Sequence, residues 1–127
     1  MPKDFSTEKQ SCITQAEHSS IEVMKSFHSC TQVANTFRFD EGSKLKYYAT
    51  LYTANGLTVS SEHEAVDITD KVGSGDCFMA GLIYGNINSQ GDKQTLEFAT
   101  AAAVDKMFVM GDATTSTPDQ IKKRIKN

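Results

Sequence analysis

The chain has 127 residues and a formal net charge of -3, and 39% of its residues are hydrophobic. This length indicates one domain, and the absence of a basic stripe and of an apolar run of about twenty residues argues against partners such as nucleic acid or a membrane. Three scattered cysteines, Cys12, Cys30 and Cys77, disfavour a disulfide framework and a zinc site, and with the polar first residues they predict a cytoplasmic protein.

The N-terminal part of the chain predicts a loose start followed by a helix. Residues 1–10 are polar and show no apolar period. Residues that share one helical face then follow, namely Ile13, Ala16, Ser20, Met24 and Phe27. We therefore expect a helix over residues 13–28.

The middle of the chain predicts strands. Residues 31–37 read as a short strand, and residues 45–52, LKYYATLY, are rich in aromatic and β-favouring side chains. The polar segment FDEGSK separates the two. Asn55-Gly56 predicts a hairpin turn whose two central residues both adopt positive φ, with Leu57 opening the return strand. A further short strand is expected over residues 64–68.

The second half predicts helices. Residues 74–87 and 93–109 are expected to be helical, and Gly111 ends the second of these. Thr117 and Pro118 have the pattern of an N-cap followed by a proline at the first helical position, with an apolar face at Ile121 and Ile125. The basic residues near the C-terminus are interpreted as the cationic end of this last helix: Lys122, Lys123, Arg124 and Lys126.

The segment DKVGSGDCFMAG, residues 70–81, is the part of the sequence that indicates a binding or catalytic site. Gly73, Ser74 and Gly75 stand where a helix begins, and the first backbone N–H groups of a helix suit an anion, most often a phosphate. Asp76 has two interpretations at this stage. It is either a residue that caps the helix or a carboxylate that accepts a hydroxyl proton during phosphoryl transfer. No Gly-Lys-Ser/Thr occurs, so the segment is not a Walker loop.

The longer stretch DKVGSGDCFMAGLIYG resembles the C-terminal signature of the PfkB (ribokinase-like) family of sugar kinases. Residues at the fixed positions of that signature are Asp70, Val72, Gly73, Gly75, Asp76, Phe78 and Gly81, and Ser74 stands where alanine is common. The resemblance implies that Asp76 is the general base. It also implies that the N–H groups of Gly73, Ser74, Gly75 and Asp76 form the anion hole, and that Mg²⁺ arrives with ATP.

The order of the preceding segments, VANTFRF and then LKYYATLYTANGL, is similar to that of the 2-dehydro-3-deoxygluconate kinase branch of the family. By this resemblance Thr36 and Arg38 lie on the ATP side. The alanine-rich helix around residues 99–103 would pack beside the adenine, with Thr100 and Ala103 as contacts, although many members carry an asparagine where Thr100 stands. Asp70 and Val72 match positions that help to hold a monovalent cation such as K⁺ in some members.

The resemblance covers residues 20–127 and implies the C-terminal, nucleotide-binding part of a three-layer α/β/α fold with an incomplete sheet; residues 1–19 are left as a poorly defined N-terminal segment. The implied reaction is ATP-dependent phosphorylation of a sugar or sugar acid, with 2-dehydro-3-deoxygluconate as the first candidate. Family members are much longer. A non-catalytic nucleotide-binding or interaction fragment and a fructokinase-like enzyme therefore stay open, as do a homo-oligomer and pairing with a missing N-terminal half.

Overall fold

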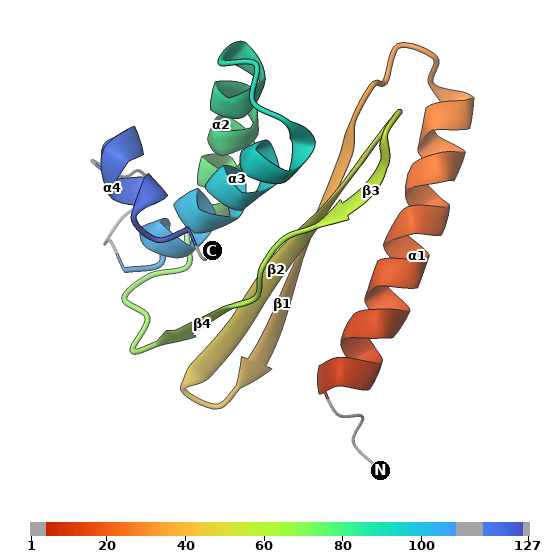
Figure 1. Cartoon of the computed structure of the whole chain (residues 1–127). Helices are drawn as coiled ribbons and strands as arrows, with labels where there is room; N and C mark the ends of the chain where they lie inside the picture. Colours follow the sequence, from red (N-terminus) through yellow and green to blue (C-terminus); the bar gives the residue numbers. More distant parts are fainter. Residues whose placement is uncertain (1–4, 109–115, 126–127) are drawn as a thin grey trace.

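The computed structural model describes residues 5–108 and 116–125 of the chain. Its elements in chain order are α1 (Phe5–Ser26), β1 (Val33–Glu41), β2 (Lys44–Thr53), β3 (Gly56–Val59), β4 (His63–Val66), α2 (Ser74–Ile87), α3 (Asp92–Lys106) and α4 (Pro118–Lys122). Helix α1 covers one face of the sheet, and α2 and α3 lie on the other face (Figure 1). The predicted α/β class, with three layers and an incomplete sheet, is confirmed.

Strand β2 is the centre of an antiparallel sheet. Along one edge it pairs with β1, from Val33↔Tyr52 to Glu41↔Lys44. Along its other edge it pairs first with β4 and then with β3. Because helices cover both faces, β2 is buried at most positions on both sides, which explains its nearly continuous aromatic and apolar sequence.

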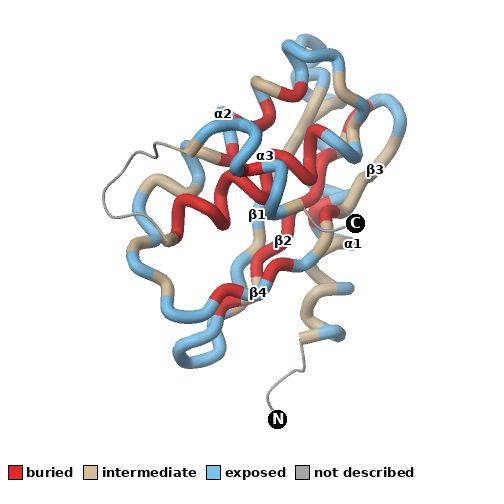
Figure 2. Tube along the Cα trace, turned by 60° about the vertical axis from the view of Figure 1, so that its left-hand side comes forward, coloured by how far each residue is buried: buried red, intermediate tan, exposed pale blue. Residues whose placement is uncertain are grey.

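The main core lies between the sheet and the helices α2 and α3. Buried residues concentrate in β2 and α3 (Figure 2). The cluster that joins the sheet to the two helices consists of Leu45, Tyr47, Ala49, Leu51, Ala65, Phe78, Leu82, Leu96, Ala99, Ala103, Val104 and Met107. A second cluster joins α3 to α4 through Phe98, Ala101, Ala102 and Ile121. Through Phe78 and Leu82 in the first cluster, helix α2 packs against α3.

Helix α1 begins earlier than the sequence predicts. The expectation of a loose segment is wrong for residues 5–10, which form the first turns of the helix. The predicted boundary between an N-terminal segment, residues 1–19, and the rest of the chain falls inside this helix. Contacts with the sheet explain the helical start. The Phe5 ring lies 5.4 Å from the Phe39 ring, and the ammonium group of Lys9 pairs with Glu62 at 2.6 Å. These are long-range contacts, which local periodicity does not report.

The remaining elements follow the predictions closely, with shifts at their ends. Strand β1 continues to Glu41, so that the predicted polar break shrinks to a short turn at Gly42 and Ser43. The β2–β3 hairpin is confirmed, but only Gly56, with a φ of 102°, takes the positive φ that was predicted for both turn residues. Helix α2 has the predicted bounds, and α3 ends at Lys106. Gly111 lies outside the described residues.

Helix α4 confirms the predicted cap. The Thr117 side chain accepts a hydrogen bond from the N–H of Gln120, the Gln120 side chain accepts one from the N–H of Thr117, and Pro118 occupies the first helical position. Arg124 pairs with Asp105 at 2.8 Å. Of the basic residues interpreted as the cationic end of this helix, Lys122 lies in its last turn, whereas Lys123 and Arg124 follow that turn. Lys126 lies outside the described residues. No helix in the described ranges is long and apolar enough to cross a membrane.

Candidate functional site

The connection that leads into α2 is attached to the end of α3. The backbone N–H groups of Thr69 and Asp70 both donate to the carbonyl oxygen of Met107, at 2.9 and 3.0 Å. The Asp70 carboxylate accepts a hydrogen bond from the N–H of Val72 at 3.0 Å, which closes a tight turn directly before Gly73. These bonds fix the DKVGSGD segment at the N-terminus of α2.

The N-terminus of α2 is open. Gly73 is the N-cap residue with a φ of 85°, a left-handed conformation that favours glycine, and no side chain caps the helix. Within the described part of the chain, no group accepts a hydrogen bond from the N–H of Gly75 or Asp76. A Cβ atom added to Gly75 would meet nothing within 4 Å. Free N–H groups, the positive end of the helix dipole and open space together suit an anion such as a phosphate.

Asp76 is exposed in the first turn of α2. A capping carboxylate would accept a hydrogen bond from a backbone N–H at the helix start, and within the described residues Asp76 accepts no such bond. Nor does Asp76 form an ion pair with any residue in the described ranges. The carboxylate is therefore accessible to a ligand beside the open N–H groups, and of the two interpretations of Asp76 the cap has no bond to support it.

Strand β1 brings a second part of the predicted site to the same place. Thr36 and Arg38 are exposed, and Arg38 is the cross-strand neighbour of Tyr47 on the sheet face that α3 covers. Asp40 lies 3.9 Å from Arg38 and 3.3 Å from Lys71, which belongs to the segment before α2. Exposed pairs of this kind add little stability. They nevertheless show that the end of β1 and the glycine segment are neighbours.

Tyr47 connects this region to the core. Burial raises the pKa of its hydroxyl to about 12, while a hydrogen bond with Thr36 and the charge of Arg38 oppose the rise. Because the folded-state pKa exceeds the ordinary value of 10.0, the associated stability is complete below pH 10 and decreases as the pH rises toward 12.

We expect the free energy of unfolding of the unmodified chain to fall, relative to a Tyr47→Phe variant, by up to about 3 kcal/mol across that interval. Urea unfolding of both proteins at several pH values between neutral pH and about 12 measures this difference. Parallel pH profiles would contradict the assignment, because the phenylalanine ring cannot ionise.

The two contacts predicted on the alanine-rich helix face inward. Thr100 and Ala103 are both 0% exposed, and the Thr100 hydroxyl donates to the carbonyl oxygen of Leu96 at 2.8 Å. Ala103 packs against the sheet as part of the main core. Contact of either residue with a nucleotide stays a prediction, and this packing leaves no open space beside them.

A different side of α3, a fraction of a helical turn away from Thr100 and Ala103, borders an open space. Phe98 and Ala102 border an apolar hollow of about 220 Å³ between α2, α3 and α4. The other residues that line it are Cys77, Ala80, Gly81, Tyr84, Ser116, Pro118 and Ile121. The rings of Tyr84 and Phe98 stack at 4.7 Å beside it. Because Cys77 directly follows Asp76, the hollow begins one residue from the open helix start, and its apolar walls suit a flat aromatic group.

This hollow was not predicted from the sequence. A signal for it is present as two apolar stripes at helical spacing, with Cys77, Gly81 and Tyr84 on α2 and Phe98 and Ala102 on α3. The spacing alone does not say which of two apolar faces of α3 meets the sheet. Only the packing of α3 decides this.

Asp70 and Val72 have structural roles in the segment before α2. One carboxylate oxygen of Asp70 is used by the N–H of Val72, and the Val72 side chain is exposed. Among the described residues, no group of three or more side chains could hold a metal ion. A monovalent cation at this point would depend on backbone carbonyl groups, and its binding stays a prediction.

Cys77 has the properties of a structural thiol. Burial raises the pKa of the thiol above its ordinary value, although the positive charge of Lys106 opposes this shift. Since the thiolate is the reactive form, a raised pKa disfavours reactivity at neutral pH. The raised pKa favours an unreactive thiol, but the predicted burial is only partial, because Cys77 is half-buried and lines the hollow.

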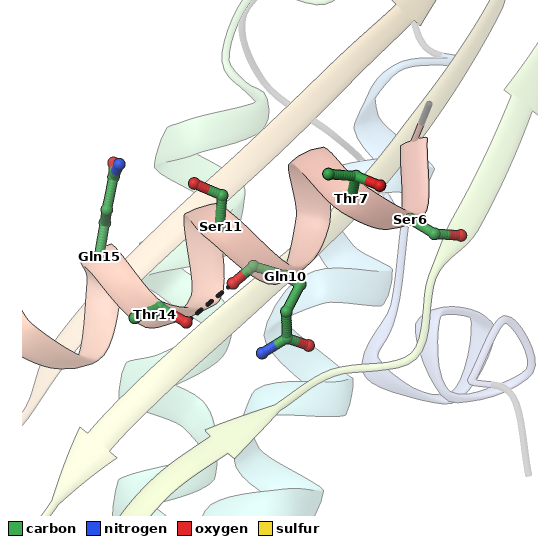
Figure 3. A pocket seen from close by; sticks show the side chains of 6 residues that line it. All are labelled: Ser6, Thr7, Gln10, Ser11, Thr14 and Gln15. Atoms are coloured by element: carbon green, nitrogen blue, oxygen red, sulfur yellow. Dashed lines mark hydrogen bonds between the residues drawn. The ribbon is translucent and has the colours of Figure 1, made fainter. Parts of the chain in front are cut away.

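A broad hollow along α1 is not a candidate site. The six residues that line it are Ser6, Thr7, Gln10, Ser11, Thr14 and Gln15, all from the one helix, and Thr14 donates a hydrogen bond to the carbonyl oxygen of Gln10 at 3.0 Å (Figure 3). No second element forms an opposite wall, and none of these side chains is charged. It is a polar helix surface rather than a cleft.

Comparison with known proteins gives a consistent family. The pfkB family of carbohydrate kinases matches residues 9–119. Among curated proteins, no sequence matches the chain significantly. Structurally similar proteins include 2-dehydro-3-deoxygluconokinase from Thermotoga maritima, with a TM-score of 0.77 and 26% identity over 83% of this chain and 32% of that protein.

Two further solved structures agree with this result. A PfkB family carbohydrate kinase from Listeria grayi has a TM-score of 0.77 and 25% identity, over 81% of this chain and 32% of its own. A putative 2-keto-3-deoxygluconate kinase from Enterococcus faecalis has a TM-score of 0.72 and 25% identity, over 80% of this chain and 29% of its own. The chain spans about a third of the length of these structures.

Proposed function

The chain belongs to the pfkB family of carbohydrate kinases, and we propose that it is the nucleotide-binding part of an enzyme that phosphorylates a sugar acid with ATP. The observation that carries the proposal is the open start of α2. There the N–H groups of Gly75 and Asp76, which have no acceptor among the described residues, lie beside the exposed carboxylate of Asp76. Donors for negative charge next to a base are the pair that phosphoryl transfer to a hydroxyl needs.

In the proposed reaction, Asp76 accepts the proton of the sugar hydroxyl while the hydroxyl oxygen forms a bond to the terminal phosphorus of ATP. The bond from that phosphorus to the bridging oxygen breaks, and ADP leaves. The N–H groups of Gly75 and Asp76 donate to the oxygens of the transferred group, and Gly73 and Ser74 shape the turn that aims them. Positioning and electrostatic stabilisation supply most of the catalysis in such a transfer.

The proposed nucleotide position uses the hollow between α2, α3 and α4 for the base and the start of α2 for the phosphates. The apolar walls at Tyr84, Phe98 and Ala102 suit an aromatic ring. Thr36 and Arg38 of β1 are the proposed polar groups at the other side of the phosphates. Magnesium is proposed to arrive with ATP and to be held mainly by the phosphates and water.

The proposed substrate is 2-dehydro-3-deoxygluconate or a related sugar acid. Two of the similar structures are kinases whose names specify this sugar acid. We propose a cytoplasmic location, where ATP is available. A fructokinase-like activity is the alternative within the family. A phosphorylation assay with both sugars, on the chain completed by the rest of the fold, separates them.

A second candidate function is a nucleotide-binding segment without catalysis. The observation in its favour is that the chain spans about a third of the length of similar kinases. Calorimetry with ATP, combined with circular dichroism to establish folding, tests both candidates. Saturable ATP binding without sugar phosphorylation by the completed protein favours the second candidate. A folded chain without ATP binding contradicts both.

A Gly75→Ala variant gives this test a specific form. Its methyl group would enter the open space in front of the free N–H groups and keep the phosphates at a distance, so we expect ATP affinity to fall about tenfold or more while the fold is kept. Calorimetry measures the affinity, and Gly91→Ala is the matched control, because that glycine also has no neighbour within 4 Å but stands at the start of α3. Equal ATP affinity of the two variants would exclude the proposed anion hole.

A further inference from the structure

A further hollow, of about 640 Å³, lies between the β3–β4 connection at Ser61, the turn before α3 at Gln90, and the helices α3 and α4. Gln90 follows the C-terminal end of α2, whereas Asp76 lies in the first turn of that helix, and the ends of a helix of 14 residues are about 20 Å apart. Of the described residues that line this hollow, Phe98 alone also borders the hollow between α2, α3 and α4. The two hollows are therefore separate sites.

A buried carboxylate with one unused oxygen borders this second space, which we call the Glu97 hollow. Glu97 is only 5% exposed. Its Oε1 accepts a hydrogen bond from the N–H of Ser61 at 2.7 Å and lies 3.1 Å from the ammonium group of Lys93. Its Oε2 is buried and has no hydrogen-bond donor among the described residues. Because buried polar atoms in folded proteins are nearly always paired, this oxygen indicates a donor that the described residues do not supply.

A second acceptor in the Glu97 hollow has the same requirement. The side-chain oxygen of Gln90, Oε1, is buried and has no hydrogen-bond partner in the part of the chain that the structure describes. Amide and carboxylate oxygens accept hydrogen bonds and do not donate them. A primary ammonium group has three donors, and its positive charge complements the carboxylate, so it suits this pair of acceptors.

The charges around the Glu97 hollow favour a ligand that also carries an anionic group. Two lysines, Lys93 and Lys122, line the hollow beside the carboxylate of Glu97. Lys93 is paired with that carboxylate and donates to the carbonyl oxygen of Val59 at 2.7 Å. Within the described ranges Lys122 pairs with no carboxylate, and its ammonium group lies 5.8 Å from the centre of the Tyr84 ring. A simple amine would add to an excess of positive charge, whereas a ligand with its own carboxylate would pair with Lys122.

Another part of the wall is apolar. Phe98 is buried and stacks on Tyr84, and Ile125 packs against the same cluster of side chains. Both Phe98 and Ile125 line the Glu97 hollow. An apolar wall with a small number of placed polar groups is the usual composition of a small-molecule site, in which the polar groups fix the orientation of the ligand.

We propose that the Glu97 hollow binds an α-amino acid with an apolar side chain. The ammonium group of the ligand donates to Oε2 of Glu97 and to Oε1 of Gln90. A rotation of the Glu97 carboxylate about its last torsion, which has a broad minimum in glutamate, turns Oε2 toward the ligand. The carboxylate of the ligand pairs with Lys122, and its side chain lies against Phe98 and Ile125. The proposal rests on the hollow and its two unpaired acceptors, and not on the proposed phosphoryl transfer.

The test compares leucine with two analogues that each lack one of its charged groups. Isoamylamine has no carboxylate, and isocaproate has no ammonium group. Titration of the isotope-labelled chain, followed by NMR in the absence of any nucleotide, measures each affinity and locates the binding site. We expect leucine to bind saturably and to shift the backbone N–H signals of residues 90–98 but not those of residues 73–76. Both analogues should bind at least about tenfold more weakly, because each loses a charged partner.

Two pairs of variants assign the two ends of the ligand. Glu97→Gln should weaken leucine binding at least about tenfold, because the amide has no charge to pair with the ammonium group. Glu64→Gln is its control, since Glu64 is an exposed glutamate of β4 that pairs with Lys44 at 4.0 Å. Lys122→Gln should weaken leucine binding about threefold and leave isoamylamine binding unchanged. Lys123→Gln, which removes the exposed charge of the next residue, should change neither.

Several results would overturn the proposal. A folded chain that binds none of leucine, methionine and phenylalanine would hold only water at the two acceptors. Equal affinity for leucine and either analogue, equal effects of Glu97→Gln and Glu64→Gln, or shifts at residues 73–76 in place of residues 90–98 would each exclude the assigned site. If Glu97→Gln unfolds the chain, the two analogues and the lysine variants decide the question. If the isolated chain does not fold, the same titrations are made on the completed kinase.

Discussion

Replacing Asp76 by asparagine should reduce the rate of sugar phosphorylation by the completed kinase about 10²- to 10⁴-fold, the usual contribution of a positioned general base. The asparagine side chain has nearly the same size but cannot accept the hydroxyl proton. Because Asp76 is exposed and forms no hydrogen bond or ion pair with the described residues, we expect the substitution to leave the stability of α2 unchanged. We therefore expect kcat to fall while the melting temperature and the affinity for ATP change little. Steady-state kinetics with saturating ATP and sugar acid measure the effect.

Asp119→Asn is the matched control for this experiment. Asp119 is also an exposed aspartate in the first turn of a helix, namely α4, and so has the same local electrostatics without the neighbouring glycine turn. It should leave the rate within about twofold of normal, because it lies outside the proposed site. If Asp76→Asn retains a comparable rate, the carboxylate is not the base, and the open helix start would have to act through its N–H groups alone.

The glycine segment is the part of the site that could be predicted from the sequence. Its bounds in α2, the position of Gly73 before the helix and the open space at Gly75 all follow from local chemistry, because few residues other than glycine accept a φ of 85° or leave room for a ligand at a helix start. That Arg38 lies near this segment was predicted only from the family resemblance. In the structure it depends on Asp40, which contacts Arg38 on its own strand and Lys71, 31 residues further along the chain.

The alanine-rich helix shows what local pattern could not decide. Helix α3 is apolar on most of its circumference, and twelve of its fifteen residues are buried. A helix with apolar residues all round gives no sign of which face meets the sheet and which meets α4. Thr100 and Ala103 face inward, whereas Phe98 and Ala102 border the hollow, because the register of α3 is set by its close approach to α2.

That close approach gives the second large expected effect. Gly81→Ala should lower the free energy of unfolding by about 2 to 4 kcal/mol, since overpacking forces the two helices apart. The added Cβ would lie 2.6 Å from the Cα of Ala99, 3.2 Å from its Cβ and 3.3 Å from its backbone nitrogen. Two of these atoms are backbone, which cannot rotate away as a flexible side chain could. Urea unfolding followed by circular dichroism measures the loss.

Gly75→Ala separates this packing effect from the general effect of adding a methyl group to α2. The Cβ at Gly75 meets nothing within 4 Å, and alanine is the better helix former, so this variant should be as stable as the unmodified chain or more stable by up to about 1 kcal/mol. The two glycines of one motif would thus have opposite requirements. Gly81 permits the contact between α2 and α3 that orients the helix, and Gly75 keeps the start of the same helix accessible. Equal unfolding midpoints for the two variants would contradict this division, because only one of the two added methyl groups has a neighbour to displace.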